Sequence, residues 1–404
     1  MRNKKGILII LLVLFLCMLS SCAERIPENP SFDSLESRVI GMPTYASVCW
    51  GNYVINKWND ATYDRVTGEL VYGLCENPEC NQSCIFHNGS MRPKAIKNNV
   101  FYFVFEGRVA KTRYYCAKNL LTGDIDVLFE VGYDNITPND AMFVEDEYVY
   151  YTRKYLKDGG NPALPNDYHS FVCRVSLEGG DSEKVYELRG NSETLRILTD
   201  GMMLTTWENS FYRIDTTTGV QTKLLSLEDA GFFGISELQY LDGMLYFQVK
   251  PENSLIAAPN GQPTQQLRLV ILNTKTGEWR YLVDVPVLTY RLCDDAIYYS
   301  PVEFRQVNDP NIYAPTDLEG AKYLLGSSTL YACDHDGGNV RAVYTDETHT
   351  LDFINHYTVV DGVLYGWIFE FDFNANKFGQ SFFAEIRFDT GEVIRPTSIV
   401  DMRK

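Results

Sequence analysis

The chain has few of the residues and motifs that acid–base or nucleophilic catalysis requires. It contains only five His in 404 residues, and none belongs to an H-E-x-x-H pair. The G-x-S-x-G elbow, the Walker phosphate loop and the dinucleotide-binding fingerprint are also missing from the sequence. No residue can be nominated as catalytic on this basis, and we expect a protein that is not an enzyme.

Basic residues are also scarce. The 36 Lys and Arg are outnumbered by 53 Asp and Glu, which gives a formal net charge of −17 at pH 7. An acidic surface repels nucleic acid, so we expect no nucleic-acid partner. Long helical periodicities are absent too, whereas 13% of the residues are aromatic, including 27 Tyr and 22 Phe. Aromatic side chains pack well on pleated sheets, so this composition favours strands.

The only long apolar run lies at the N-terminus. Basic residues precede it, and it covers residues 6–19. A run of this length is shorter than the roughly 20 residues that a membrane-spanning helix needs, and the pattern is typical of a signal peptide. Residues 19–22, Leu-Ser-Ser-Cys, resemble the lipobox of bacterial lipoproteins. We expect a signal peptide at 1–21, then a lipidated Cys22 and a flexible tether at 22–42, outside the cytoplasm. The alternative is an ordinary secretory signal in which Cys22 has no role.

A turn that contains Gly recurs about every 50 residues, a spacing found in propeller repeats. Its copies contain Gly68, Gly123, Gly179, Gly219, Gly277, Gly337 and Gly391. Tight hairpins require a positive φ, which Gly adopts easily, and a Tyr-rich strand precedes most copies. We predict an all-β fold for 43–404: a β-propeller with seven blades of four antiparallel strands. Six or eight blades are alternative counts. A pair of β-sandwiches is the alternative fold, although it would not repeat a turn at this spacing.

Three polar insertions that contain Pro interrupt the repeats, at 156–169, 250–266 and 303–323. Insertions in a propeller gather on the faces of the disc, where ligands commonly bind. Aromatic residues in or beside these insertions are therefore candidate ligand contacts, and they are Tyr155, Tyr168, Tyr313 and Tyr323. Ordinary packing is the alternative role for each of them.

Three of the eight Cys that follow Cys22 are crowded together with a His. They form the pattern C-x4-C-x3-C-x2-H, made by Cys75, Cys80, Cys84 and His87. Thiolates and an imidazole suit the tetrahedral coordination of a structural zinc. Exported proteins also form disulfides, so a disulfide that leaves one thiol over is the alternative, and it is slightly favoured over the metal. The other five lie in or beside strand-like segments, where we expect them to pack as small apolar residues: Cys49, Cys116, Cys173, Cys293 and Cys333.

The lipobox, the Tyr-rich repeats with Thr-Gly turns and the Leu74-Cys75 run after the first repeat resemble a known group of sequences. They are similar to uncharacterised propeller lipoproteins of gut Firmicutes, near the domain-of-unknown-function and TolB-like propellers. The resemblance implies a lipid-anchored propeller outside the cytoplasm. It implies no activity, because that group has none established.

These features together favour a binding module at the cell surface. Its expected partners are the membrane, through the N-terminal lipid, and an envelope protein or a glycan held on one face of the disc. We expect the protein to be a monomer. The alternative is an extracellular carbohydrate-active enzyme, because two carboxylates at a propeller channel could act as acid and base. A scaffold for an envelope complex is a third hypothesis.

Overall fold

The structure is a computed structural model, and residues Ser37–Lys404 form one compact unit separate from Met1–Glu36. Within it the structure describes residues 39–40, 47–50, 53–56, 61–72, 89–107, 111–119, 122–132, 141–164, 167–190, 192–199, 201–252, 255–257, 263–307, 322–345, 349–350, 357–372 and 377–401. These residues contain no α-helix. In the same part of the chain, no helix is long and apolar enough to span a membrane.

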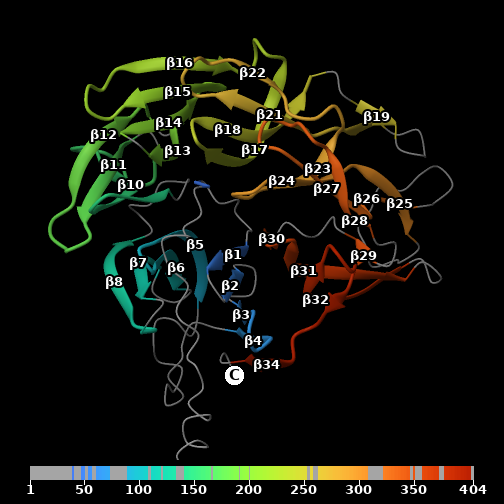
Figure 1. Ribbon diagram of the computed structural model, residues 1–404. Helices are drawn as coiled ribbons and strands as arrows, with labels where there is room; N and C mark the ends of the chain where they lie inside the picture. Colours follow the sequence, from blue (N-terminus) through green and yellow to red (C-terminus); the bar gives the residue numbers. More distant parts are fainter. Residues whose placement is uncertain are drawn as a thin grey trace, which may run out of the picture. The chain divides into compact units, whose positions relative to one another are not determined.

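Seven sheets, each with four strands in antiparallel order, are the blades of a β-propeller (Figure 1), and two further hairpins form sheets of their own. The first strands of the blades are β1 (Ser47–Trp50), β5 (Gly89–Lys97), β9 (Met142–Glu145), β13 (Thr194–Thr199), β17 (Phe232–Leu241), β23 (Val287–Leu292) and β30 (Tyr357–Val360). The second strands are β2 (Tyr53–Asn56), β6 (Val100–Gly107), β10 (Tyr148–Leu156), β14 (Met202–Trp207), β18 (Met244–Pro251), β24 (Ile297–Pro301) and β31 (Val363–Asp372). The third strands are β3 (Ala61–Asp64), β7 (Thr112–Asn119), β11 (Tyr168–Ser176), β15 (Ser210–Asp215), β21 (Arg268–Asn273), β27 (Thr329–Cys333) and β32 (Lys377–Arg387). The fourth strands are β4 (Glu69–Tyr72), β8 (Ile125–Gly132), β12 (Glu183–Leu188), β16 (Gln221–Ser226), β22 (Trp279–Tyr281), β28 (Arg341–Thr345) and β33 (Val393–Ile394).

Three of the contacts between blades join first strands, namely β5 with β9, β9 with β13, and β1 with β30. First strands that touch across blades must be the innermost ones, so each blade runs outward from the centre. The predicted fold of seven four-stranded blades is therefore confirmed. The first strand of blade 7 is preceded by β29 (His349–Thr350), which pairs with the same edge of β31.

The antiparallel order places the connections of each blade at two opposite ends. Turns between first and second strands, and between third and fourth strands, lie at one end, which we call the turn face. Connections between second and third strands, and between blades, lie at the other end, the loop face. The seven predicted Gly turns all join third and fourth strands. Gly277 shows why Gly is needed, because its φ is +77° and a Cβ there would lie 2.8 Å from the Leu224 carbonyl of the preceding blade.

The hydrophobic core is divided into seven clusters, and each cluster lies between two neighbouring blades. Between blades 2 and 3, for example, Tyr115 of β7 packs against Tyr151 of β10 with ring centroids 5.4 Å apart. Full burial of one such side chain contributes about 1.5–3 kcal/mol. Because one cluster joins blade 7 to blade 1, the core closes the ring.

Contacts between the two ends of the chain reinforce this closure. The last strand, β34 (Ser398–Asp401), pairs in parallel with the outermost strand of blade 1, β4. Thr397 donates its amide to the Gly68 carbonyl and its hydroxyl to the Thr67 carbonyl, both at 2.9 Å. The Tyr63 hydroxyl of blade 1 donates to the buried carboxylate of Glu385 in blade 7.

A short N-terminal segment contacts blade 5. Ile40 exchanges two backbone hydrogen bonds with Tyr240 of β17, at 2.9 and 2.8 Å. Val39 and Ile40 belong to the segment expected to be a tether, yet both pack against core clusters of blade 5. Because Ile40 runs antiparallel to β17 near its turn-face end, the chain at this point runs from the turn face toward the loop face.

Candidate functional site

All three long insertions lie on the loop face, because each one joins a second strand to a third strand. The first, 157–167, connects β10 to β11. The second contains the hairpin β19 (Leu255–Ala257) and β20 (Pro263–Gln265), and the third contains the hairpin β25 (Glu303–Val307) and β26 (Lys322–Gly326). On the turn face the longest connection is 334–340. The irregular surface of the propeller is therefore concentrated on one face.

The insertion of blade 3 is held together by its own hydrogen bonds. Lys157 donates its amide to the Asp167 carbonyl at 2.7 Å, and Asn161 donates its amide to the Asp167 carboxylate at 2.8 Å. Tyr168 lies below this loop, only 7% exposed, and donates its hydroxyl to the Pro162 carbonyl at 3.1 Å. Tyr168 therefore packs against its own loop, which is the alternative role stated for it, and a role in binding stays a prediction, whereas Leu164 is 51% exposed.

Tyr155 lies half-buried near the loop-face end of β10, and two cations contact its ring. The Arg153 guanidinium is 5.0 Å from the ring centroid, and the Lys184 ammonium is 4.2 Å from it. Burial, and next to it the neighbouring Cys173, raise the pKa of Tyr155 to about 12. Because two side chains already cover this ring, little of it is open to a ligand. A role for Tyr155 in binding stays a prediction.

Blade 2 carries a charged triad near its loop-face end. The carboxylate of Glu106, near the end of β6, accepts hydrogen bonds from Arg92 of β5 at 2.6 Å and from Arg113 of β7 at 2.5 Å. Its side chain is 17% exposed, and that of Arg113 is 12% exposed. Hydrogen bonds between charged groups are strongest when water is largely excluded, so the triad fixes the positions of both guanidinium groups.

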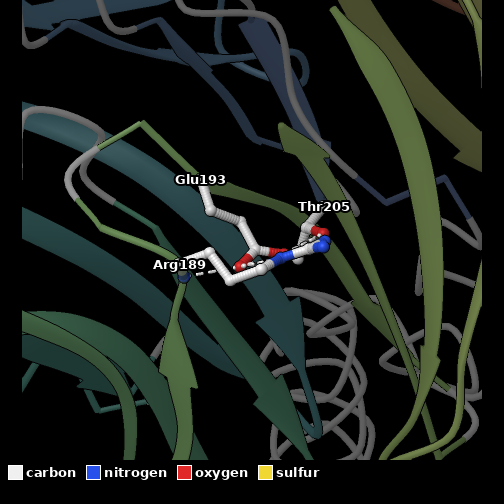
Figure 2. A network of polar contacts seen from close by, with 3 residues as sticks. All are labelled: Arg189, Glu193 and Thr205. Atoms are coloured by element: carbon white, nitrogen blue, oxygen red, sulfur yellow. Dashed lines mark hydrogen bonds and ion pairs between the residues drawn. The ribbon is translucent and has the colours of Figure 1, made fainter. Parts of the chain in front are cut away.

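A second polar network organises the connection between blades 3 and 4 (Figure 2). Glu193 is buried, and its carboxylate accepts the Arg189 amide at 2.7 Å and the Thr205 hydroxyl at 2.7 Å. The Arg189 guanidinium lies beside the same carboxylate, with two N–O distances of 3.4 Å. A buried charge is tolerated when donors surround it in this way. Burial, and next to it the Glu193 charge, raise the pKa of Tyr186.

The other side of the Arg189 guanidinium faces two aromatic rings of blade 4. The guanidinium carbon is 3.9 Å from the Trp207 ring centroid and 4.6 Å from that of Tyr212. Trp207 ends β14 at the loop face, so this cation–π stack lies at the loop-face rim of the interface between blades 3 and 4. It gives the loop face a rigid aromatic and cationic surface.

Two carboxylates are fully buried among the described residues, Glu193 and Glu385. Glu193 precedes blade 4 and Glu385 belongs to blade 7, so they are not in neighbouring blades. Each one already accepts hydrogen bonds from the protein. Each buried acid is therefore held by hydrogen bonds of its own, Glu193 beside Arg189 and Thr205 and Glu385 beside Tyr63.

Five thiols pack within the blades, as predicted. Cys116, Cys173, Cys293 and Cys333 are buried, and Cys49 is partly buried. Burial raises the pKa of Cys116 to about 12 and that of Cys333 to about 11. A thiol with so high a pKa is a poor nucleophile and a poor metal ligand at neutral pH, so these residues act as small apolar side chains.

The remaining candidate residues cannot be placed in the same way. Cys22, Tyr313 and the set Cys75, Cys80, Cys84 and His87 lie outside the described residues, and of Tyr323 the structure describes only the backbone, in β26. Within the described part of the chain, no three His, Cys, Asp or Glu side chains gather in a way that could hold a metal. Lipidation, the zinc and the disulfide stay predictions.

Sequence reasoning missed the charged residues near the loop-face ends of blades 2 to 4. Arg113, Arg153 and Arg189 are not in a recognisable motif. The sequence did contain a signal for Arg113 and Arg153. Each lies two positions from a core Tyr on the same strand, Tyr115 and Tyr151 respectively. Residues two apart share one side of a strand, so these Arg extend the aromatic core toward the loop face.

Comparisons with known proteins bear on the fold. No protein-family model matches the chain, and no curated protein matches it. A prolyl endopeptidase structure is 10% identical with a TM-score of 0.52, over 90% of this chain and 50% of that one, so the chain spans about half of its length. An oligogalacturonate lyase of Vibrio parahaemolyticus is 9% identical with a TM-score of 0.48, over 83% and 88% of the two chains. An acylaminoacyl peptidase is 12% identical with a TM-score of 0.47, over 85% and 52%. At such low identity the likeness concerns the fold alone, and the chain is by fold a seven-bladed β-propeller.

Proposed function

We propose that this protein is a non-enzymatic binding module of the cell envelope, lipid-anchored through Cys22, which holds a protein or a glycan on its loop face. The observation that carries the proposal is that the long connections between strands lie on one face and the short ones on the other. The insertions 157–167, 252–267 and 302–328 are all on one face, whereas the other face consists of short turns. Long irregular segments on a rigid scaffold are the usual place for ligand contacts.

The chemistry of the loop face supports binding. The Arg189, Trp207 and Tyr212 stack is fixed by the buried Glu193. Aromatic and Arg side chains held in place before binding lose little conformational freedom when a partner docks. Leu164 and Phe233 add exposed apolar surface near the same end of the blades, at 51% and 64% exposure.

The experiment is chemical cross-linking on intact cells that produce the full chain, followed by affinity recovery and mass spectrometry. Leu164→Ser alters the loop face, and Val220→Thr alters an exposed residue of similar type beside a turn of the other face. We expect a partner cross-linked to the loop-face insertions, recovered with V220T and depleted with L164S. Cys22→Ser should move the protein out of the membrane fraction.

Two results would reject the proposal. One is a partner that is lost with V220T and still recovered with L164S, because the turn face would then be the binding surface. The other is release of products from an envelope or dietary polysaccharide by the purified chain, lost when a single carboxylate is substituted. That second result would establish the carbohydrate-active enzyme instead.

A further inference from the structure

The packing of blade 2 against blade 3 places two Arg at the same interface. Tyr115 and Phe129 of blade 2 contact Tyr151 of blade 3, with ring centroids 5.4 and 4.4 Å apart. Arg113 lies two residues from Tyr115 toward the loop face, and Arg153 lies two residues from Tyr151 in the same direction. Because side chains two apart in a strand share one side of it, both Arg point into the interface between these blades.

On the blade 3 side of this interface, two cations lie beside one aromatic ring, and the Glu187 carboxylate on the same side of the blade is paired with His169 at 2.6 Å. Arg153 and Lys184 both lie within about 5 Å of the Tyr155 ring, and Lys184 is also 4.3 Å from the Phe171 ring. Neither side chain has a carboxylate partner within the described part of the chain. The Arg153 Nε is buried, and no hydrogen-bond acceptor reaches it among the described residues.

The blade 2 side adds further positive charge. Arg92 and Arg113 share the carboxylate of Glu106. The charged side chains on the two sides of this interface thus include three Arg and one Lys, while Glu106 is paired with Arg92 and Arg113, and Glu187 is paired with His169. The Arg153 Nε is buried whereas Lys184 is exposed, so water screens only part of the repulsion between these cations. An anion between the blades would relieve this repulsion and accept the buried Arg153 N–H.

We propose that the loop-face end of the interface between blades 2 and 3 is a binding site for an oxyanion, formed chiefly by Arg153 and Lys184. The planar guanidinium fits a carboxylate, sulfate or phosphate with two parallel hydrogen bonds, and the ammonium adds a point charge. The oxyanion comes either from a uronic acid unit of an oligosaccharide or from a free inorganic anion. The first source rests on the proposed function, since it makes the site part of the ligand-binding loop face.

The test is isothermal titration of the purified full chain at constant ionic strength. The probes are sodium phosphate, sodium sulfate, a tetrasaccharide of galacturonic acid and a neutral glucose tetrasaccharide. We expect binding of at least one anionic probe and none of the neutral one. Preference for the acidic tetrasaccharide identifies a glycan, and equal binding of sulfate or phosphate identifies a free anion.

Substitutions locate the site. Arg153→Gln should weaken binding about tenfold or more, as expected for a lost charge-assisted hydrogen bond. Arg153→Lys keeps the charge without the planar fork, so its affinity should lie between those of the wild type and R153Q. The control Arg341→Gln removes the same charge from an exposed position after a turn-face connection. Thermal unfolding curves confirm that each variant is folded.

Three results would overturn the proposal. One is that no anion binds to the wild type, and another is that R341Q weakens binding as much as R153Q. The third concerns Asp134 and Asp140, in the segment that joins blades 2 and 3, outside the described residues. If the double variant D134N/D140N binds anions and the wild type does not, one of these two Asp carboxylates occupies the site in the native protein. If the wild-type chain binds no anion and yet a partner is still recovered through the loop face in cells, the anion site is rejected and the proposed function stands.

Discussion

Removal of the Glu193 carboxylate tests whether the connection between blades 3 and 4 depends on one buried charge. In Glu193→Ala, the Arg189 amide and the Thr205 hydroxyl lose their acceptor, both at 2.7 Å in the native protein. The Arg189 guanidinium loses the only carboxylate beside it among the described residues. These donors cannot easily reach water, because the Glu193 side chain is wholly buried.

The expected effect follows from the number of donors left without an acceptor. Each buried donor without a partner costs about 1–3 kcal/mol. Two such donors, together with the partly exposed guanidinium, should lower the free energy of unfolding by about 3–5 kcal/mol. Thr205→Val removes a single donor and should cost about 1–2 kcal/mol. Because both substitutions break the same hydrogen bond, the double variant should lose about 1 kcal/mol less than the sum.

Urea unfolding followed by Trp fluorescence measures these changes. Glu228→Ala is the matched control, because Glu228 is an exposed Glu in the next connection, between blades 4 and 5. It should shift stability by less than about 0.5 kcal/mol. A loss below about 1 kcal/mol for E193A, or strict additivity with T205V, would show that the network is not a unit and refute the reasoning.

Three other predictions follow from burial and ring closure. Burial raises the pKa of Cys116 from 9.0 and that of Tyr246 from 10.0, each to about 12, so the folded state retains protons that the unfolded state loses first. The contribution of these two groups to the free energy of unfolding should be fully present below about pH 9 and should decrease as the pH rises toward 12. A free energy of unfolding that increases above pH 9, measured by urea titration, would contradict this. Deletion of 398–404 removes the four residue pairs between β34 and β4 and should lower stability by about 2–4 kcal/mol, whereas deletion of 402–404 should not; equal melting temperatures would argue against closure by this strand. The last prediction concerns the segment with Cys75, Cys80, Cys84 and His87, measured on the chain after Cys22, which contains eight Cys. If the segment binds zinc, the protein should contain one zinc, and all eight thiols should react after denaturation with a chelator. If the segment forms a disulfide, the protein should contain no zinc, and six thiols should react.

The blade pattern could be predicted because it depends on local chemistry. A turn with positive φ needs Gly, and a half-buried strand needs alternate apolar residues, so each blade carries its own signal. Gly277 and Gly337 occupy the predicted turns, and their φ values are +77° and +82°. For Tyr168 the sequence left binding and ordinary packing open, because an aromatic beside a loop can either face solvent or pack beneath that loop.

Contacts between distant residues could not be predicted in this way. Ile40 pairs with Tyr240, and β34 pairs with β4, although neither pair shares a local motif. Arg113 and Arg153 belong to the same interface only because Tyr115 of blade 2 packs against Tyr151 of blade 3. The sequence by itself determined the strands, the turns and the number of blades, since these follow from the spacing of Gly and apolar residues. Only the tertiary structure decided which face carries the insertions, how the ring closes and which charges meet between blades, because those depend on packing of elements far apart in the chain.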